Sequence, residues 1–267
     1  MTRALKAEFL KLKGSRTLLW AAIVVIAYAI LATVLNAVLL KDPAITARIT
    51  SAGGSFRQAV DSGFYQVDWP NQLRVAVQGI SGTWGILLFS FVATYVFGRE
   101  YKDGTAKNML TLPVRREYFI AAKMVVVATW IFCLMLLSLG LHAIGLVIVG
   151  VPGFAWRHVW GALWDGITVT FAIYLTLPLV AWITMTGRGY LRGMLFALAA
   201  VMVGNGLAAT SLSRYYPWNL PVHLVGASWM PIVSVHPVLG SWIVSACVFL
   251  AGLVLATRQT DAADDVS

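Results

Sequence analysis

Six apolar stretches, each near the length needed to cross a lipid bilayer as a helix, recur along this chain of 267 residues. A hydrocarbon core of about 30 Å is crossed by about 20 helical residues. Every backbone amide in that core must find its hydrogen bond within the protein, which leaves helices or closed barrels, and barrel strands would be short and alternating. The sequence therefore predicts an all-α polytopic membrane protein.

The predicted layout is a single transmembrane domain over residues 1–267 that begins with an interfacial helix at 1–16. The six spans are expected at about 17–40, 80–98, 119–150, 167–186, 194–211 and 239–257. The third stretch exceeds the thickness of a bilayer, so it either tilts or its first turns stand in water, and Lys123 favours the second. We expect a polar loop at 41–79. Four prolines divide 212–238 into short interfacial or re-entrant pieces.

Charged residues make up only 12% of the chain, with a formal net charge of +9. A soluble domain carries about a quarter charged residues, so this surface must largely face lipid. Basic residues of membrane proteins gather on the cytoplasmic side. With both termini cytoplasmic, 14 of the 20 Lys and Arg fall in the cytoplasmic pieces 1–16, 99–123, 187–193 and 258–267. This predicts a multi-pass protein of the cytoplasmic membrane, in contact with lipid and without a nucleic-acid partner.

His142 is the clear ionisable residue within a predicted span, where such residues are candidates for function. A hydrogen bond to another helix is the favoured interpretation, ahead of a contact with substrate. Asn205 lies between two glycines, which favours packing or a dimer contact over a place in a transport pathway. Asp165 is expected as a solvated carboxylate at the outer start of the fourth span.

Thr83 and Trp84 lie in the second span among glycines, a composition that suits close packing against another helix. With His142 and Asn205, they are the candidates for a pathway or a dimer interface. Cys133 and Cys247 are expected to be small core residues.

The sequence contains no Gly-x-x-x-x-Gly-Lys-Ser/Thr motif for ATP phosphates, and no Gly-x-Ser-x-Gly, His-Glu-x-x-His or Cys-x-x-Cys motif. We therefore predict no catalytic residue, no metal site and no cofactor.

The most charged stretch, residues 98–123, lies on the predicted cytoplasmic side. Thr105 or Asp103 can cap a short helix, and Pro113 ends it. Met109 and Leu110 then share one face of this helix with Pro113. Such a face suits docking of a cytoplasmic partner, but a solvated basic loop explains the residues equally well.

The residues of this stretch resemble the cytoplasmic loop of ABC-type-2 permeases, in particular the bacterial single-domain branch with bacitracin-resistance and lantibiotic-immunity exporters. The resemblance is carried by Glu100, Gly104, Thr105, Met109, Leu110, Pro113, Arg115, Arg116 and Lys123. Residues 7–13 similarly resemble the entry helix of that family.

This resemblance implies a coupling helix that seats in a groove of a separate ABC ATPase subunit, present in two copies. Met109, Leu110 and Pro113 would supply its apolar contacts. Glu100, Arg115 and Arg116 would fix its orientation.

The implied function is an ATP-driven exporter of a drug, an antimicrobial peptide or a lipid-like molecule, formed with a second permease copy or a paralogue. The chain itself would be no enzyme. The alternatives are a membrane sensor or assembly protein and a membrane-embedded lipid-modifying enzyme. A secondary transporter is less favoured, because neither internal repeats nor broken helices are evident in the sequence.

Overall fold

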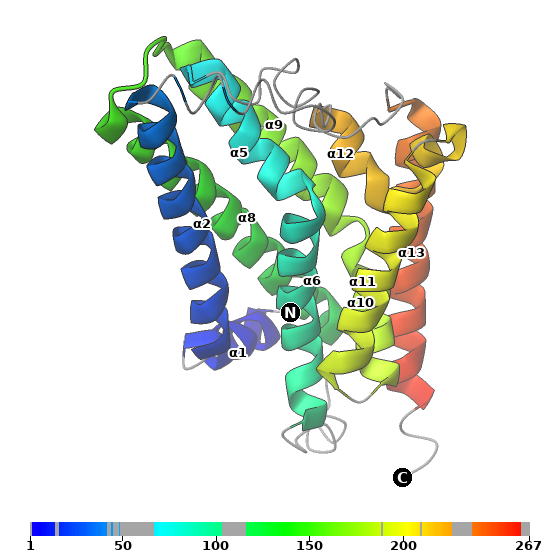
Figure 1. Ribbon diagram of the computed structural model, residues 1–267. Coiled ribbons are helices and arrows are strands. Elements are labelled where there is room, and N and C mark those ends of the chain that lie inside the picture. Colours follow the sequence, from blue (N-terminus) through cyan, green and yellow to red (C-terminus); the bar gives the residue numbers. More distant parts are fainter. Residues whose placement is uncertain are drawn as a thin grey trace.

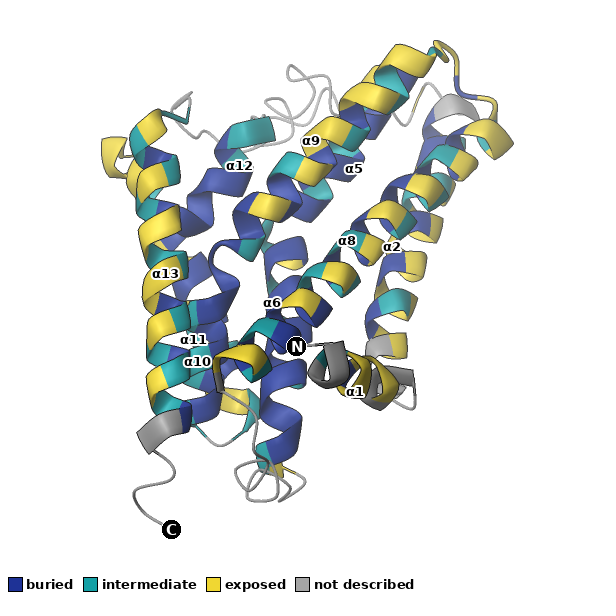
Figure 2. Ribbon diagram, turned by 180° about the vertical axis from the view of Figure 1, so that it is seen from behind, coloured by how far each residue is buried: buried dark blue, intermediate teal, exposed yellow. Residues whose placement is uncertain are grey.

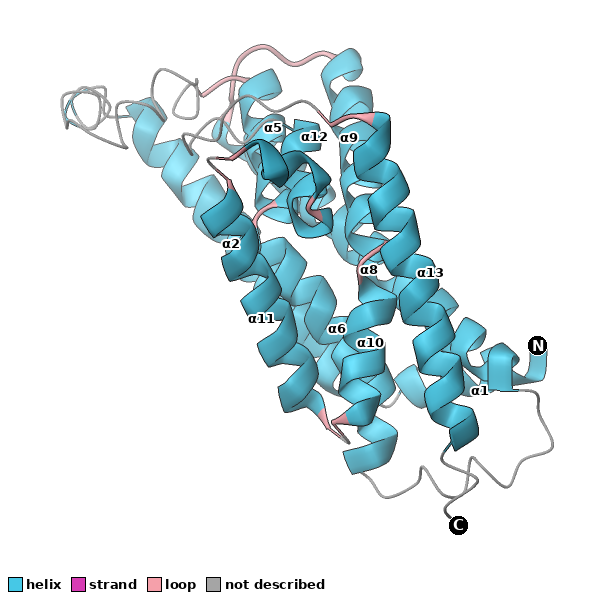
Figure 3. Ribbon diagram, turned by 90° about the vertical axis from the view of Figure 1, so that its right-hand side faces the viewer, coloured by secondary structure: helices cyan, strands magenta, loops and turns pink. Residues whose placement is uncertain are grey.

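The computed structural model describes residues 2–13, 16–41, 44, 48, 67–102, 116–187, 189–208, 210–225 and 237–262. Every regular element in this part of the chain is a helix (Figure 3). The α-helices are α1 (Thr2–Lys13), α2 (Arg16–Lys41), α5 (Trp69–Ser81), α6 (Thr83–Lys102), α8 (Arg116–Val149), α9 (Trp156–Tyr174), α10 (Leu177–Thr186), α11 (Tyr190–Leu207), α12 (Leu220–Val225) and α13 (Leu239–Ala262); two 3-10 helices are η1 (Ser211–Tyr215) and η2 (Pro217–Asn219).

The long helices run side by side, with α2 at one edge of the bundle and α13 at the other (Figure 1). Helix α1 lies across the foot of α2 and packs against α8. Short helix α12 lies at the opposite end of the bundle. We call these two ends the α1 end and the α12 end.

Five helical stretches of the described chain are long and apolar enough to cross a membrane, and the α5–α6 pair makes a sixth if it counts as one span. The five are Leu19–Leu39, Glu117–Val149, Trp156–Thr186, Tyr190–Leu207 and Leu239–Thr260. Each of the six predicted apolar stretches has a counterpart here. The chain is a polytopic, all-helical membrane protein.

Periodic apolar side chains place the core on one face of α8. Ile120, Met124, Val127 and Ile131 are buried at intervals of three or four residues, which is the spacing of one helix face. Helices at the edge expose much more of their surface, as the exposed residues along α2 and α13 show (Figure 2). Lipid-facing helices need no polar outer face, so this exposure agrees with a membrane protein.

The helical stretch that contains the predicted second span is interrupted where α5 meets α6, as in a broken span or a re-entrant loop. The two helices are bent by 48° at Gly82. A Cβ atom at Gly85 would collide with the main-chain carbonyl of Ile80, so glycine permits the close approach of the backbone at the bend. Broken helices had not been expected from the sequence, and this one is a correction.

Helix α5 occupies part of the predicted polar loop, and its start has the local signals of a helix. Asp68 caps it, with Oδ1 accepting a hydrogen bond from the backbone amide of Asn71 at 2.9 Å. Pro70 stands in the first turn, where a proline is tolerated. The indole of Trp69 donates to the carbonyl of Val151 at 3.0 Å, which ties α5 to the connection before α9.

The expectation for Asp165 is wrong in its place along the helix, and the expectation that the two cysteines lie in the core is wrong. Helix α9 begins at Trp156, well before the predicted start at 167, so Asp165 lies within the helix. It is exposed there, and Arg74 of α5 acts on it electrostatically. Cys133 and Cys247 are also exposed, on the outside of the bundle.

At the α12 end, η1, η2 and α12 form the short pieces that the prolines predicted, while residues 226–236 lie outside the described residues. Asn219 donates hydrogen bonds to the carbonyl of Gly204 at 2.9 Å and to the hydroxyl of Ser213 at 2.8 Å. The same hydroxyl lies 2.9 Å from Nε2 of His223. Burial lowers the pKa of His223, which favours a neutral ring.

Candidate functional site

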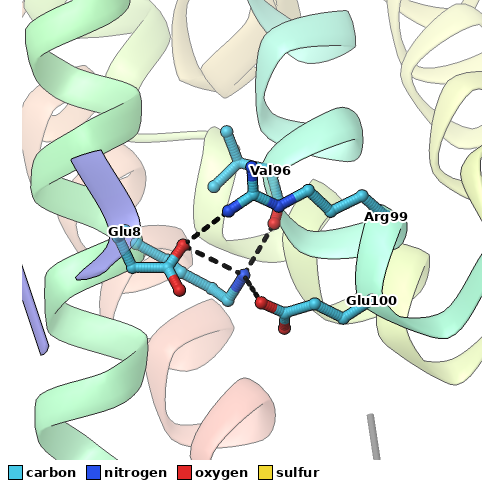
Figure 4. Close-up of polar contacts among 5 residues, drawn as sticks. Glu8, Val96, Arg99 and Glu100 are labelled. Atoms are coloured by element: carbon cyan, nitrogen blue, oxygen red, sulfur yellow. Dashed lines mark hydrogen bonds and ion pairs between the residues drawn. The ribbon is translucent and has the colours of Figure 1, made fainter. Parts of the chain in front are cut away.

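The segment 103–115 was the strongest sequence signal, and the two helices that flank it meet at the α1 end. Helix α6 ends at Lys102, and α8 begins at Arg116. Four charged side chains, Glu8, Arg99, Glu100 and Lys123, gather between these helices and α1 (Figure 4). We call these four residues the charge cluster.

Lys123 of α8 is the centre of the charge cluster. Its Nζ donates to the carbonyl of Val96 at 2.7 Å and lies 3.0 Å from a carboxylate oxygen of Glu100. The same nitrogen lies 3.5 Å from Oε2 of Glu8. The Lys123 side chain is only 1% exposed, so these contacts replace its hydration.

Within the charge cluster, Glu8 connects α1 to α6. Its Oε2 accepts a hydrogen bond from Nη2 of Arg99 at 3.0 Å, and the Glu8 side chain is 2% exposed. Figure 4 shows Glu8 facing Arg99 across the gap between α1 and α6. Two carboxylates therefore balance one guanidinium and one ammonium in a buried site.

Helix periodicity explains how a lysine reaches this position. Lys123 lies next to Ile120 and Met124 on the core face of α8. Its ammonium lies 4.8 Å from the ring centroid of Phe119 and 5.6 Å from that of Phe97, at distances where aromatic faces attract cations. A buried charge persists when it is paired and hydrogen-bonded, which these contacts provide.

Lys123 is buried against other helices, whereas Glu117 and Tyr118 in the first turn of α8 are exposed. The other two members of the charge cluster, Glu8 and Arg99, were missed, because their contact joins distant parts of the sequence. Glu8 and Arg99 are 91 residues apart. One signal was present: Glu8 is the single acidic residue among residues 1–16.

The predicted coupling residues divide into two groups. Glu100 lies in the charge cluster, and Arg116 is the first residue of α8. The others lie outside the described residues: Gly104, Thr105, Met109, Leu110, Pro113 and Arg115.

The candidates for a pathway or dimer interface differ in their burial. Thr83 and Trp84 begin α6, with Trp84 84% exposed, and Asn205 is exposed near the end of α11. His142 is buried in α8. Within the described residues, no hydrogen bond reaches either nitrogen of its ring, although the main chain of Gln72 lies near enough to act on it. The main chain of Gln72 in α5 is therefore the neighbour that could supply the helix–helix contact expected of His142.

Comparison with known proteins gives one family and one relative. A family model described as "ABC-2 family transporter protein" matches residues 4–204. The chain is 28% identical over 156 residues to "Bacitracin transport permease protein BCRB" of Bacillus licheniformis, which covers 55% of this chain and 71% of that protein. No solved structure matches the chain.

Proposed function

This chain belongs to the ABC-2 family of transporter proteins, and we propose that it is the permease subunit of an ATP-driven exporter. The family match carries the proposal, because it runs through the charge cluster and through segment 103–115. ATP hydrolysis would come from a separate ABC ATPase, because the sequence has no phosphate-binding motif of its own. Two permeases, as identical copies or as a pair of paralogues, would work with two ATPases.

In the proposed mechanism, segment 103–115 is the coupling helix. Met109, Leu110 and Pro113 dock in a groove of the ATPase. Glu100 is paired with Lys123 inside the bundle, so its part is to fix the flanking helices rather than to contact the ATPase. Such coupling shifts the permease between two arrangements only if the partner binds one of them better.

The proposed orientation places the α1 end and both termini in the cytoplasm, because the larger share of Lys and Arg lies in the pieces that connect to this end. The relative is named for bacitracin transport. We therefore propose an amphipathic peptide antibiotic as the class of substrate, which agrees with a chain so rich in apolar residues.

Survival of a bacitracin-sensitive host tests the proposal. The host expresses this chain alone, its ATPase alone, or both, and the inhibitory concentration of bacitracin is measured. Protection should require both proteins and should fall when Met109 and Leu110 are both changed to Asp. Equal sensitivity of all strains to bacitracin and to other amphipathic peptides, with both proteins present in the membrane, would contradict export of this class.

A further inference from the structure

Glu8 attaches α1 to the rest of the bundle. Among residues 5–10, whose side chains the structure describes, it is the one buried side chain of α1, while Phe9 and Leu10 are exposed. Its carboxylate contacts Arg99 of α6 and Lys123 of α8. Among these described side chains the buried contact is ionic, and the half-buried Leu5 adds apolar packing.

The partners of Glu8 are the helix ends that flank segment 103–115. Arg99 is in the last turn of α6, and Lys123 is in the second turn after the start of α8. Lys123 also pairs with Glu100, so the same cluster fastens α6 to α8. A movement that separated any of these helices would leave an unpaired charge in a buried site, which is strongly unfavourable.

Helix α1 precedes α2 in the chain, and the packing of α2 allows it to move together with α1. Of the most apolar 18 residues of α2, only 22% are buried in the bundle. The corresponding share for the α9–α10 span is 61%. Its packing is mainly on α8, the helix that carries Lys123. Among the described residues, α6 is the other helix that packs against α2, and it does so less extensively than α8.

We propose that Glu8 is a positioning residue of the coupling apparatus, which makes α1 move with the ends of α6 and α8 and passes that movement to α2. The inference rests on the proposed function, in which an ATPase displaces segment 103–115. It adds α1 and α2 to the moving parts and names the side chain that recruits them.

Spin-label distances in the permease–ATPase complex test this inference without knowledge of the substrate. Labels at Leu10→Cys and Arg258→Cys report α1 against α13, and labels at Lys102→Cys and Arg258→Cys report the end of α6 against α13. All three native positions are exposed. Cys133 and Cys247 are replaced by Ala, and labelled chains are diluted with unlabelled ones, so that each distance lies within one chain. Distances are compared without nucleotide and after trapping with ATP and vanadate.

Three variants are compared with the unchanged cluster. Glu8→Gln removes the carboxylate but keeps its size. Glu8→Gln with Arg99→Gln restores a neutral cluster, which provides a folded protein if the single variant is too unstable. Lys6→Gln changes an exposed charge on the same helix and is the matched control. Recovery of the ATPase with each variant is measured in parallel.

With the unchanged cluster and with Lys6→Gln, trapping should shift both distances by more than the width of their distributions. In the two Glu8 variants, the ATPase should still be recovered and the α6–α13 distance should still shift, while the α1–α13 distance stays fixed. A merely structural role would instead reduce folded protein and ATPase recovery together.

The inference is overturned if the α1–α13 distance still shifts in both Glu8 variants, or if it stays fixed in the unchanged protein while α6 moves. A bound ATPase that shifts neither distance in the unchanged protein would count against the proposed function itself, which separates the two failures.

Discussion

Lys123 is the residue on which the buried polar contacts of the α1 end converge. It contacts two carboxylates, one backbone carbonyl and two aromatic rings. Replacing a buried charge group by apolar residues is often tolerated when all partners change together, whereas removal of one partner is costly. Single substitutions in the charge cluster should therefore lower stability more than paired substitutions that keep it neutral.

We expect Lys123→Met to lower the free energy of unfolding by about 3–5 kcal/mol, because it leaves an excess carboxylate in a buried site. Lys123→Met combined with Glu100→Gln should recover much of this loss. Unfolding of the detergent-solubilised chain gives the measurement, and Lys102→Met, at an exposed position, is the control. A single variant as stable as the control would show that the cluster is not a buried ionic site.

Two members of the charge cluster, Glu100 and Lys123, were candidates from the sequence, but their contact with each other was not predicted. The charge of Lys123 predicted a position exposed to water. Its place on the core face of α8 instead buries the side chain inside the bundle. Its partner Glu8 could not be paired with it from spacing, because the contact joins helices far apart in the sequence. Contacts of this kind depend on the packing of three helices.

At the scale of elements, each predicted apolar stretch coincides with a long helix, and the polar helix α5 was missed. Helix α5 carries Gln72, Arg74 and Gln78, which lowered its hydropathy to that of a loop. The capping residue Asp68 and Pro70 in the first turn indicated a helix nonetheless. Segment 103–115 lies outside the described residues, so its helix stays a prediction.

The glycine at the bend between α5 and α6 is the subject of a second prediction about stability. We expect Gly85→Ala to lower the free energy of unfolding by about 1–3 kcal/mol, because the new methyl group meets the backbone of Ile80, which cannot rotate away. Gly140→Ala, where a methyl group meets open space, should leave stability unchanged or slightly higher. Thermal unfolding of both variants, prepared side by side, compares them. Equal stability would show that the bend does not require glycine.

At the scale of the whole molecule, the architecture is a helical bundle with a charged, tightly paired α1 end and lipid-exposed edges. The family match and the permease relative agree with the resemblance seen in the cytoplasmic segment. The proposed function requires an ABC ATPase that binds this chain.

Recovery of that partner is the most direct test of the central claim. The tagged chain is purified in mild detergent from its native host, and the eluate is analysed by mass spectrometry and for ATP hydrolysis. The account predicts that an ABC ATPase is recovered with the chain and lost when Met109 and Leu110 are changed to Asp, but kept with the neighbouring control Asn108→Asp. Absence of any ATP-binding subunit from the unchanged chain, or its equal recovery with the double variant, would contradict the account.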